Sequence, residues 1–267
     1  MSTSLPGYAY LVLIIILLSW LLWVPHFRRL LHISSRRAFR THPGTDSAID
    51  TDRIRALNMG LINSEQIGAY TDSLVTGVPV QRTAVGLREH WGVTDRESAR
   101  EATGWLLYCG NRAVYPSILY YVRKYPDPSE CTRQIMGENI NGAELAEFAS
   151  NLAECMYESA EEDLFPYTDA NLERGIMAWD ASRLVSLVRM SYEQGFLTEE
   201  ESWDYILQMY GQVKPVFPDW QTFATSYVIG RGMWGGSTFS YDTILSLAHK
   251  ALFHSRSPWE RYPLHTS

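Results

Sequence analysis

The sequence lacks the motifs that mark the common catalytic and metal-binding sites. It has no GxSxG nucleophile motif, no HExxH or HxxxH histidine pair, no GxxxxGK[ST] loop and no GxGxxG after a strand pattern. Its three cysteines, Cys109, Cys131 and Cys155, show no CxxC spacing, so we interpret them as reduced, buried residues of a cytosolic compartment. We therefore predict no metal and no cofactor, assign no catalytic residue, and favour a protein that is not an enzyme without excluding one.

Lysine residues are few, and the sequence gives no sign of a basic surface. Only three of the 23 basic residues are lysines, and the net charge is −7. The charge is also uneven, because five arginines and no acid precede Pro43, whereas 18 basic and 30 acidic residues follow from Pro43 onward. A nucleic-acid-binding domain needs a basic footprint, so this acidic body argues against a nucleic-acid partner.

One long hydrophobic run is present near the start of the chain. Residues 8–24, YAYLVLIIILLSWLLWV, carry no charge, and Leu5 extends the stretch to about the length that crosses a bilayer. No basic side chain precedes the run, which disfavours a cleaved signal peptide. We predict a transmembrane anchor at 5–24 with the lipid bilayer as its partner. Because the arginines of this region all follow the run, the positive-inside rule places the N-terminus outside and the C-terminal domain in the cytoplasm.

Residues 25–50 are expected to form a basic juxtamembrane segment and a linker. The pattern from Phe27 to Phe39 fits both a helix along anionic headgroups and a solvated flank. Thr41 to Thr51 is polar and rich in turn formers, as a linker is. We predict one domain over 51–256 and an extended tail over 257–267.

The domain is predicted to be all-α and built of helical hairpins. Apolar residues recur at three- and four-residue steps, without a sustained alternating pattern. Gly60, Gly92 and Gly195 are each followed by apolar residues and a capping pair, a pattern that predicts a tight turn between two helices. We expect helices at about 52–59, 64–75, 82–91, 94–109, 114–124, 128–137, 141–164, 179–194, 199–213, 220–233 and 241–253.

The stretch from Ala178 to Trp234 holds the candidate site. Asp180 and Arg183 lie three residues apart, and Arg231 shares one helical face with three aromatic residues. That face is too aromatic for solvent, so we expect Arg231 to turn inward and pair with Asp180, with Arg183 in the same network. Two interpretations stay open: a buried ion pair that joins two hairpins, or an arginine-lined pocket for an anionic ligand.

Aromatic residues near this polar cluster are the candidate pocket walls. They are Trp91, Trp179, Tyr192, Trp203, Tyr227 and Trp234. The GRGMWGG segment at 230–236 is interpreted as a glycine-rich helix end, because no strand precedes it as a phosphate loop requires.

Three segments resemble, in this order, the hallmark segments of a bacterial family catalogued as domain of unknown function 1266. They are GLREHWGVTDRESAREATGWL, AWDASRLVSLVRMSYEQGFLTEEESW and FPDWQTFATSYVIGRGMW, within residues 80–236. The resemblance implies a bacterial protein with a helical domain, and it brings no activity, substrate or cofactor with it. With the anchor, it implies a single-pass protein of the bacterial inner membrane.

These patterns together predict a membrane-anchored cytoplasmic helical domain that is a non-catalytic binding or protein-interaction module, with a protein as a possible partner. The alternative is an enzyme or small-molecule sensor with an anion-binding pocket at Asp180, Arg183 and Arg231.

Overall fold

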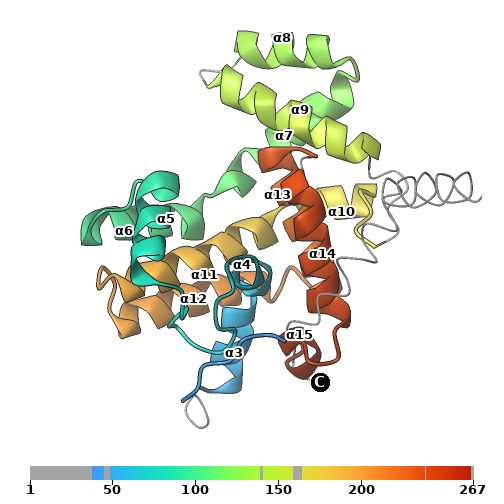
Figure 1. Cartoon of the computed structure of the whole chain (residues 1–267). Helices are drawn as coiled ribbons and strands as arrows, with labels where there is room; N and C mark the ends of the chain where they lie inside the picture. Colours follow the sequence, from blue (N-terminus) through green and yellow to red (C-terminus); the bar gives the residue numbers. More distant parts are fainter. Residues whose placement is uncertain (1–37, 45–48, 139–140, 159–163, 238, 266–267) are drawn as a thin grey trace, which may run out of the picture. The chain divides into compact units, whose positions relative to one another are not determined.

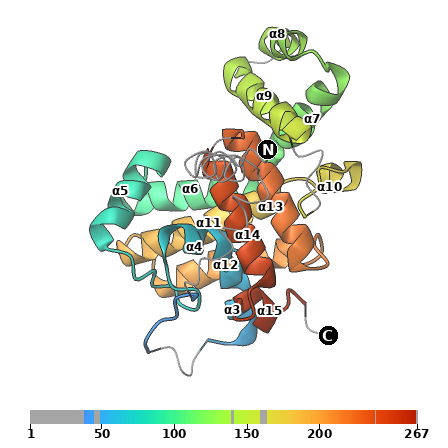
Figure 2. The same ribbon diagram turned by 45° about the vertical axis from the view of Figure 1, so that its right-hand side comes forward.

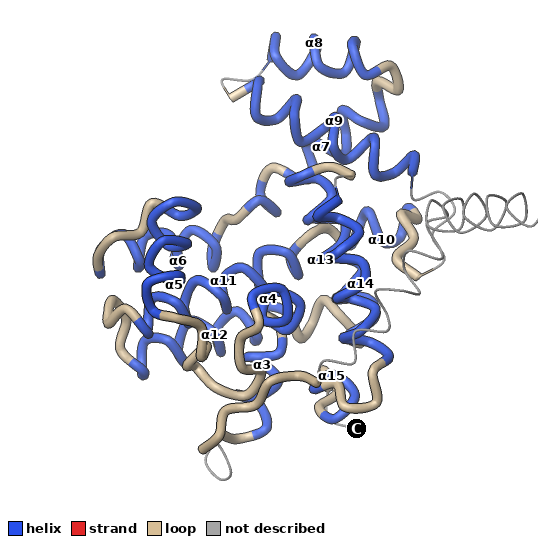
Figure 3. The backbone as a smooth tube through the Cα atoms, in the orientation of Figure 1, coloured by secondary structure: helices blue, strands red, loops and turns tan. Residues whose placement is uncertain are grey.

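The computed structural model describes residues 38–44, 49–138, 141–158, 164–237 and 239–265, and within these ranges every regular element is a helix (Figures 1 and 3). The all-α prediction is therefore confirmed for the described residues. In chain order the elements are α3 (Thr51–Asn58), α4 (Leu61–Ile67), α5 (Val80–Trp91), α6 (Arg96–Tyr108), the 3-10 turn η1 (Asn111–Ala113), α7 (Tyr115–Lys124), α8 (Pro128–Glu138), α9 (Gly142–Glu158), α10 (Asp169–Arg174), α11 (Met177–Glu193), α12 (Glu199–Val213), α13 (Trp220–Gly235), α14 (Phe239–Phe253) and α15 (Pro258–Arg261).

The transmembrane helix in the predicted fold class needs a correction. Its residues 5–24 lie outside the described ranges, and within those ranges no helix is long and apolar enough to cross a membrane. The longest described helices, α9 and α11, have 17 residues each and carry charged side chains. A membrane span needs about 20 mainly apolar residues. For the described chain, the fold class is all-α without a transmembrane helix.

Helix α11 is the centre of the main core. Eleven of its 17 residues are buried, and it packs against α4, α5, α6, α12 and α13. Figures 1 and 2 show these helices around it. The chain leaves α11 through Gly195, whose φ of 74° is the left-handed conformation that glycine adopts without strain. Thr198 and Glu201 then form a reciprocal capping box at the start of α12, so the predicted turn between these two helices is confirmed.

Helix α13 crosses α11 at close range and is buried along most of its length. Twelve of its 16 residues are buried. A Cβ atom at Gly230 would lie 2.4 Å from the Cβ of Trp179, so only glycine allows this approach. The glycines at 230–235 therefore belong to a continuous helix that ends at Gly235.

Helices α7, α8 and α9 build a second core. Helix α9 packs against α7, α8 and α13. Figure 1 shows α7, α8 and α9 lying together. Ile229 and Met233 of α13 join the buried residues of this core. Since the other face of α13 belongs to the main core, this helix connects the two cores.

The chain after α4 differs from the predicted helix at 64–75. Helix α4 ends at Ile67, and a loop runs from there to Pro79. The helix ends at Gly68, whose φ of 71° is left-handed, and Arg189 of α11, which is 2% exposed, donates into the loop that follows. Its guanidinium bonds the Ser64 Oγ (2.8 Å) and the carbonyls of Tyr70 (2.7 Å), Leu74 (3.3 Å) and Val75 (3.1 Å). The loop conformation is thus set by a side chain more than 100 residues away in sequence.

The turn predicted at Gly60 is also different. Gly60 has a φ of −91°, and α4 begins directly after it. Its lack of a side chain matters for packing, because a Cβ atom there would lie 2.7 Å from a methyl carbon of Val185.

Residues 257–265, expected as part of a tail, are packed on the main core. The ring of Trp259 stacks on Trp220 at 4.9 Å, with an angle of 4° between the planes. The Nε1 of Trp259 donates to the carbonyl of Asn58 at 2.8 Å, and Leu264 is buried. The C-terminal segment therefore joins α13 to α3.

Candidate functional site

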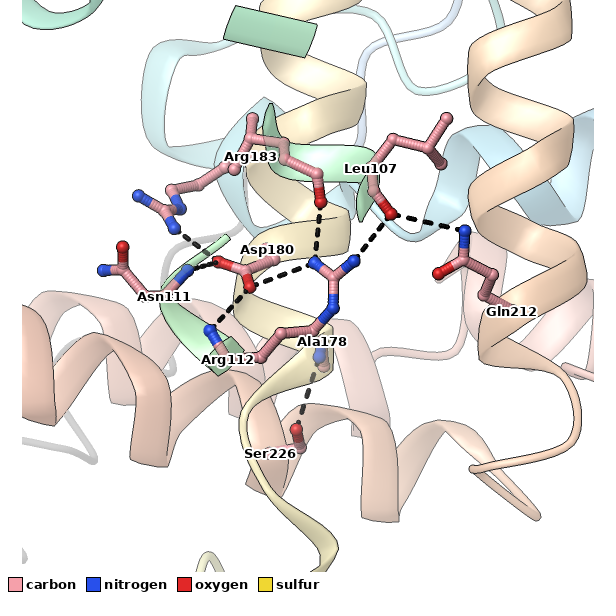
Figure 4. A network of polar contacts seen from close by, with 9 residues as sticks. Leu107, Asn111, Arg112, Ala178, Asp180, Arg183, Gln212 and Ser226 are labelled. Carbon is pink, nitrogen blue, oxygen red and sulfur yellow. Dashed lines mark hydrogen bonds and ion pairs between the residues drawn. The ribbon is translucent and has the colours of Figure 1, made fainter. Parts of the chain in front are cut away.

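Asp180, in the first turn of α11, is the centre of a buried polar network (Figure 4). Its carboxylate is fully buried and accepts four hydrogen bonds. The donors are the backbone N–H groups of Asn111 (3.1 Å) and Arg112 (3.0 Å), the Nη1 of Arg112 (3.2 Å) and the Nη2 of Arg183. Both carboxylate oxygens are thereby satisfied, which a buried charge requires.

Gly110 allows the backbone to reach this carboxylate. Its φ is 61°, and a Cβ atom there would lie 2.1 Å from the Oδ2 of Asp180. A side chain at this position would be strained and would also displace the carboxylate. The turn η1 therefore presents two consecutive N–H groups to Asp180 because Gly110 precedes it.

Arg112 extends the network to the end of α6. Its Nη1 and Nη2 donate to the carbonyls of Leu106 and Leu107, each at 2.6 Å. These carbonyls belong to the last turn of α6, where no intrahelical donor is left for them. Gln212 of α12 donates to the Leu107 carbonyl as well, at 3.3 Å. Asp180 and Arg112 thus connect α6, η1, α11 and α12.

Arg183 lies on the other side of Asp180, enclosed by tryptophan rings. Its Cζ is 4.9 Å from the ring centre of Trp179, 5.6 Å from that of Trp91 and 5.7 Å from that of Trp105. These distances are within the range of cation–π attraction. Burial lowers the pKa of Arg183, and the Asp180 carboxylate opposes that shift.

An open cleft of about 520 Å³ borders Arg183. Its walls include Trp91, Trp105 and Trp234, and the side chains of Trp105 and Trp234 are 43% and 47% exposed. Glu101 and Glu144 also line the cleft, and both are exposed. The cleft therefore combines one arginine, flat aromatic walls and two carboxylates.

Two side chains at this cleft have donor atoms without acceptors. Only the Nη2 of Arg183 makes a hydrogen bond among the described residues, and its Nε is buried without a partner. The Nδ2 of Asn111 is also buried without a partner, on a residue that is 7% exposed. Figure 4 shows the Asn111 amide and the Arg183 guanidinium on the same side of Asp180, opposite the Arg112 guanidinium. Buried donors without acceptors are costly, at about 1–3 kcal/mol each, so the protein leaves the hydrogen bonds at this end of the cleft incomplete.

The structure brings Asp180 and Arg183 together as expected, but it places Arg231 elsewhere. Arg231 is 7% exposed and its Cζ lies over the ring of Trp234, 5.1 Å from the ring centre. Burial lowers the pKa of Arg231, and the nearby Tyr227 phenol opposes the shift. The prediction that Arg231 pairs with Asp180 is therefore wrong, because Arg112 is the residue that forms this ion pair.

The predicted pocket walls divide into two groups. Trp91 and Trp234 line the cleft, Trp179 contacts Arg183, and the ring of Tyr227 meets Trp179 edge-on at 5.3 Å. Tyr192 and Trp203 are not among the residues that line the cleft. Trp203 is buried in the main core, and Tyr192 packs against that core.

Sequence reasoning missed three residues of the site: Asn111, Arg112 and Trp105. The available signal was the GNR triplet at 110–112, directly after the apolar end of α6. A glycine after a helix, followed by two residues with side-chain donors, is a pattern that ends a helix and offers N–H groups. The described residues contain no group of three or more His, Cys, Asp or Glu side chains placed to hold a metal ion.

Comparison with known proteins gives a family and no activity. The family model described as a protein of unknown function, DUF1266, matches residues 86–264. Uncharacterized protein YbeR of Escherichia coli (strain K12) is 25% identical over 148 residues, which are 55% of this chain and 56% of that protein. Uncharacterized protein YbeU of the same strain is 25% identical over 159 residues, which are 60% of this chain and 61% of that protein. The chain thus spans less than two thirds of the length of either relative.

No solved structure matches the chain. The matched family model covers more than half of the sequence, from within α5 to past α15, and includes every residue of the Asp180 network and the walls of the Arg183 cleft. The chain therefore belongs to the DUF1266 family of proteins of unknown function.

Proposed function

We propose that the domain is a non-catalytic ligand-binding module whose site is the Arg183 cleft, and that its ligand is a small organic monoanion with a carboxylate and a flat apolar body. The observation that carries this proposal is the Arg183 guanidinium at the cleft, of which only the Nη2 bonds a described residue. A carboxylate accepts from donors of this kind, and a guanidinium matches its planar geometry.

The aromatic walls support the flat apolar body of the ligand. Trp105 and Trp234 leave nearly half of their surface exposed inside a concave site, where rings of this size gain most from stacking with a ligand. A structural role for Arg183 alone would not require these rings to stay open to solvent.

The charges at the cleft limit the ligand to one negative charge. Asp180 neutralises one of its two arginine partners, so the Arg112–Asp180–Arg183 group keeps one positive charge. Glu101 and Glu144 repel a second negative charge on the ligand. We therefore expect monoanions to bind more tightly than dianions of the same shape.

Tryptophan fluorescence titrations with benzoate, terephthalate and benzamidinium test the proposal. The three probes share one ring and differ in charge. We expect a saturable change in tryptophan fluorescence with benzoate and weaker binding of terephthalate. Benzamidinium should not bind at Arg183. In Arg183→Gln, benzoate affinity should fall about tenfold or more, because a charge-assisted hydrogen bond contributes about 1.5–3 kcal/mol.

Arg88→Gln is the matched control. Arg88 lies on α5, its side chain is 60% exposed, and it does not line the cleft. This variant should bind benzoate as the wild type does. Equal benzoate affinity in Arg183→Gln and the wild type would contradict the proposal, and so would benzamidinium binding that Arg183→Gln also weakens.

A further inference from the structure

A second cleft, of about 700 Å³, lies beside α7, α10 and the start of α11. Its floor is apolar and includes the buried side chains of Leu119, Leu172 and Ile176. The Tyr115 hydroxyl donates to the Leu172 carbonyl at 2.8 Å, and Arg123 pairs with Asp169 at 2.6 Å. These two contacts hold α7 and α10 together at the cleft.

The charged residues of this cleft are mainly basic. Four cationic side chains and one acidic side chain line it: Arg112, Arg123, Lys124, Arg174 and Glu173. Arg112 is matched by Asp180, and Arg123 by Asp169 and Glu173.

Lys124 and Arg174 have no carboxylate partner among the described residues. The Nζ of Lys124 donates to the Tyr120 hydroxyl at 2.7 Å. The Nη1 of Arg174 donates to the Val216 carbonyl at 3.1 Å, and its Nε is buried without a hydrogen-bond partner. The cleft thus has two positive charges without an ion-pair partner among the described residues.

The helix dipoles explain only part of this arrangement. Lys124 and Arg174 are the last residues of α7 and α10, where a cation is favoured. The negative end of a helix corresponds to about half an elementary charge, so it cannot neutralise a full positive charge. It also gives no reason for both cations to border one cleft with an apolar floor.

We propose that this second cleft binds a phosphate group carried on an apolar or aromatic body, with Lys124 and Arg174 as the binding cations. Two unmatched positive charges suit a dianion, and the apolar floor suits the body attached to it. The inference goes beyond the carboxylate site at Arg183 and does not depend on it, because Lys124 and Arg174 do not line that cleft.

Titration of phenyl phosphate followed by phosphorus-31 NMR of the full-length protein tests this inference. We expect saturable binding that weakens as the ionic strength rises. Lys124→Gln and Arg174→Gln should each weaken it about fivefold, the effect of one partly screened charge. Inorganic phosphate should bind more weakly than phenyl phosphate, because it lacks the apolar body. Equal binding of both probes would overturn the assignment of an apolar body to the ligand.

Lys214→Gln is the matched control, because Lys214 also lies over the ring of a tyrosine one turn earlier in its helix. It should leave phenyl phosphate binding unchanged. If Arg174→Gln does not fold, Lys124→Gln decides the outcome, since the Lys124 side chain is exposed. Equal phenyl phosphate affinity in Lys124→Gln, Lys214→Gln and the wild type would overturn the inference. Benzoate binding should be unaffected in Lys124→Gln, so the two sites are tested separately.

Discussion

At the scale of single residues, two neighbouring charges on α11 have different surroundings. Asp180 is fully buried and each of its oxygens has two donors, so its contacts are complete within the protein. Arg183 has one acceptor, three aromatic neighbours and donors to spare. We infer that Asp180 maintains the fold around the site and that Arg183 contacts the ligand.

Replacing these two residues should separate stability from binding. Asp180→Ala removes the one carboxylate that pairs with Arg112 and Arg183 and the acceptor of two N–H groups, and it is expected to destabilise the domain by about 3–5 kcal/mol. Arg183→Gln leaves Asp180 with three donors and should cost about 1 kcal/mol or less. Urea unfolding of both variants measures the difference. Equal losses in the two variants would contradict this division of roles.

The sequence predicts the contact between Asp180 and Arg183 and misses Arg112, for a physical reason. Asp180 and Arg183 are one helical turn apart, so helical periodicity alone brings them together. Arg112 lies 68 residues from Asp180, and its approach depends on the conformation of Gly110. Periodicity describes only neighbours along one helix, so it could not choose between Arg112 and Arg231 as the partner.

At the scale of helices, local capping signals predict well and tertiary contacts override propensity. The sequence predicts the turn at Gly195 and the capping box of Thr198 and Glu201, because each acts within a few residues. The predicted helix at 64–75 ends after Ile67 at the left-handed Gly68, and Arg189 of α11 holds the loop that follows. A sequence window around residue 70 contains no sign of that arginine.

Glu201 makes the stability of the α11–α12 turn depend on pH. Its carboxylate accepts from Arg100 and Arg96 of α6 and from the Thr198 N–H. The contacts with Arg100 and Thr198 lower its pKa to about 2. The pKa of a glutamate in an unfolded chain is about 4.3. The lowered pKa stabilises the fold above that value, and the contribution is lost as the pH falls toward 2.

Glu201→Gln should therefore flatten the pH dependence of stability. Between pH 5 and pH 3 the free energy of unfolding of the wild type should fall more than that of the variant. The difference should not exceed about 1 kcal/mol, because solvent screens the ion pairs. Urea unfolding at both pH values measures it. Parallel pH profiles for the two proteins would show that Glu201 makes no such contribution.

At the scale of the whole molecule, the main core extends beyond the region that the family model covers. That region starts at residue 86, within α5. Leu57, Met59, Leu61 and Ile62 precede it, and each is at most 2% exposed in the main core. The carbonyls of Asn58 and Met59 also accept hydrogen bonds from Trp259 and Ser182. Helices α3 and α4 are therefore part of the folding unit.

A fragment of residues 38–265 should fold, whereas a fragment of residues 86–265 should not. Burying one large apolar side chain contributes about 1.5–3 kcal/mol. Losing four of them removes free energy comparable to the whole stability of a domain, about 5–15 kcal/mol. Thermal melting followed by circular dichroism compares the two fragments. A cooperative transition of the shorter fragment at the temperature of the longer one would contradict this view of the core.

The most direct test of the central claim is the side-chain NMR signal of Arg183. The Nε–H resonance that disappears in Arg183→Gln identifies this residue in the nitrogen-15 spectrum of the wild type. Because the Arg183 guanidinium has donors without protein acceptors, this resonance should shift on titration with benzoate and saturate at the affinity measured by fluorescence. Benzamidinium should leave it in place. A resonance that benzoate does not move, while the protein binds benzoate, would show that the ligand site lies elsewhere and that Arg183 serves only the fold.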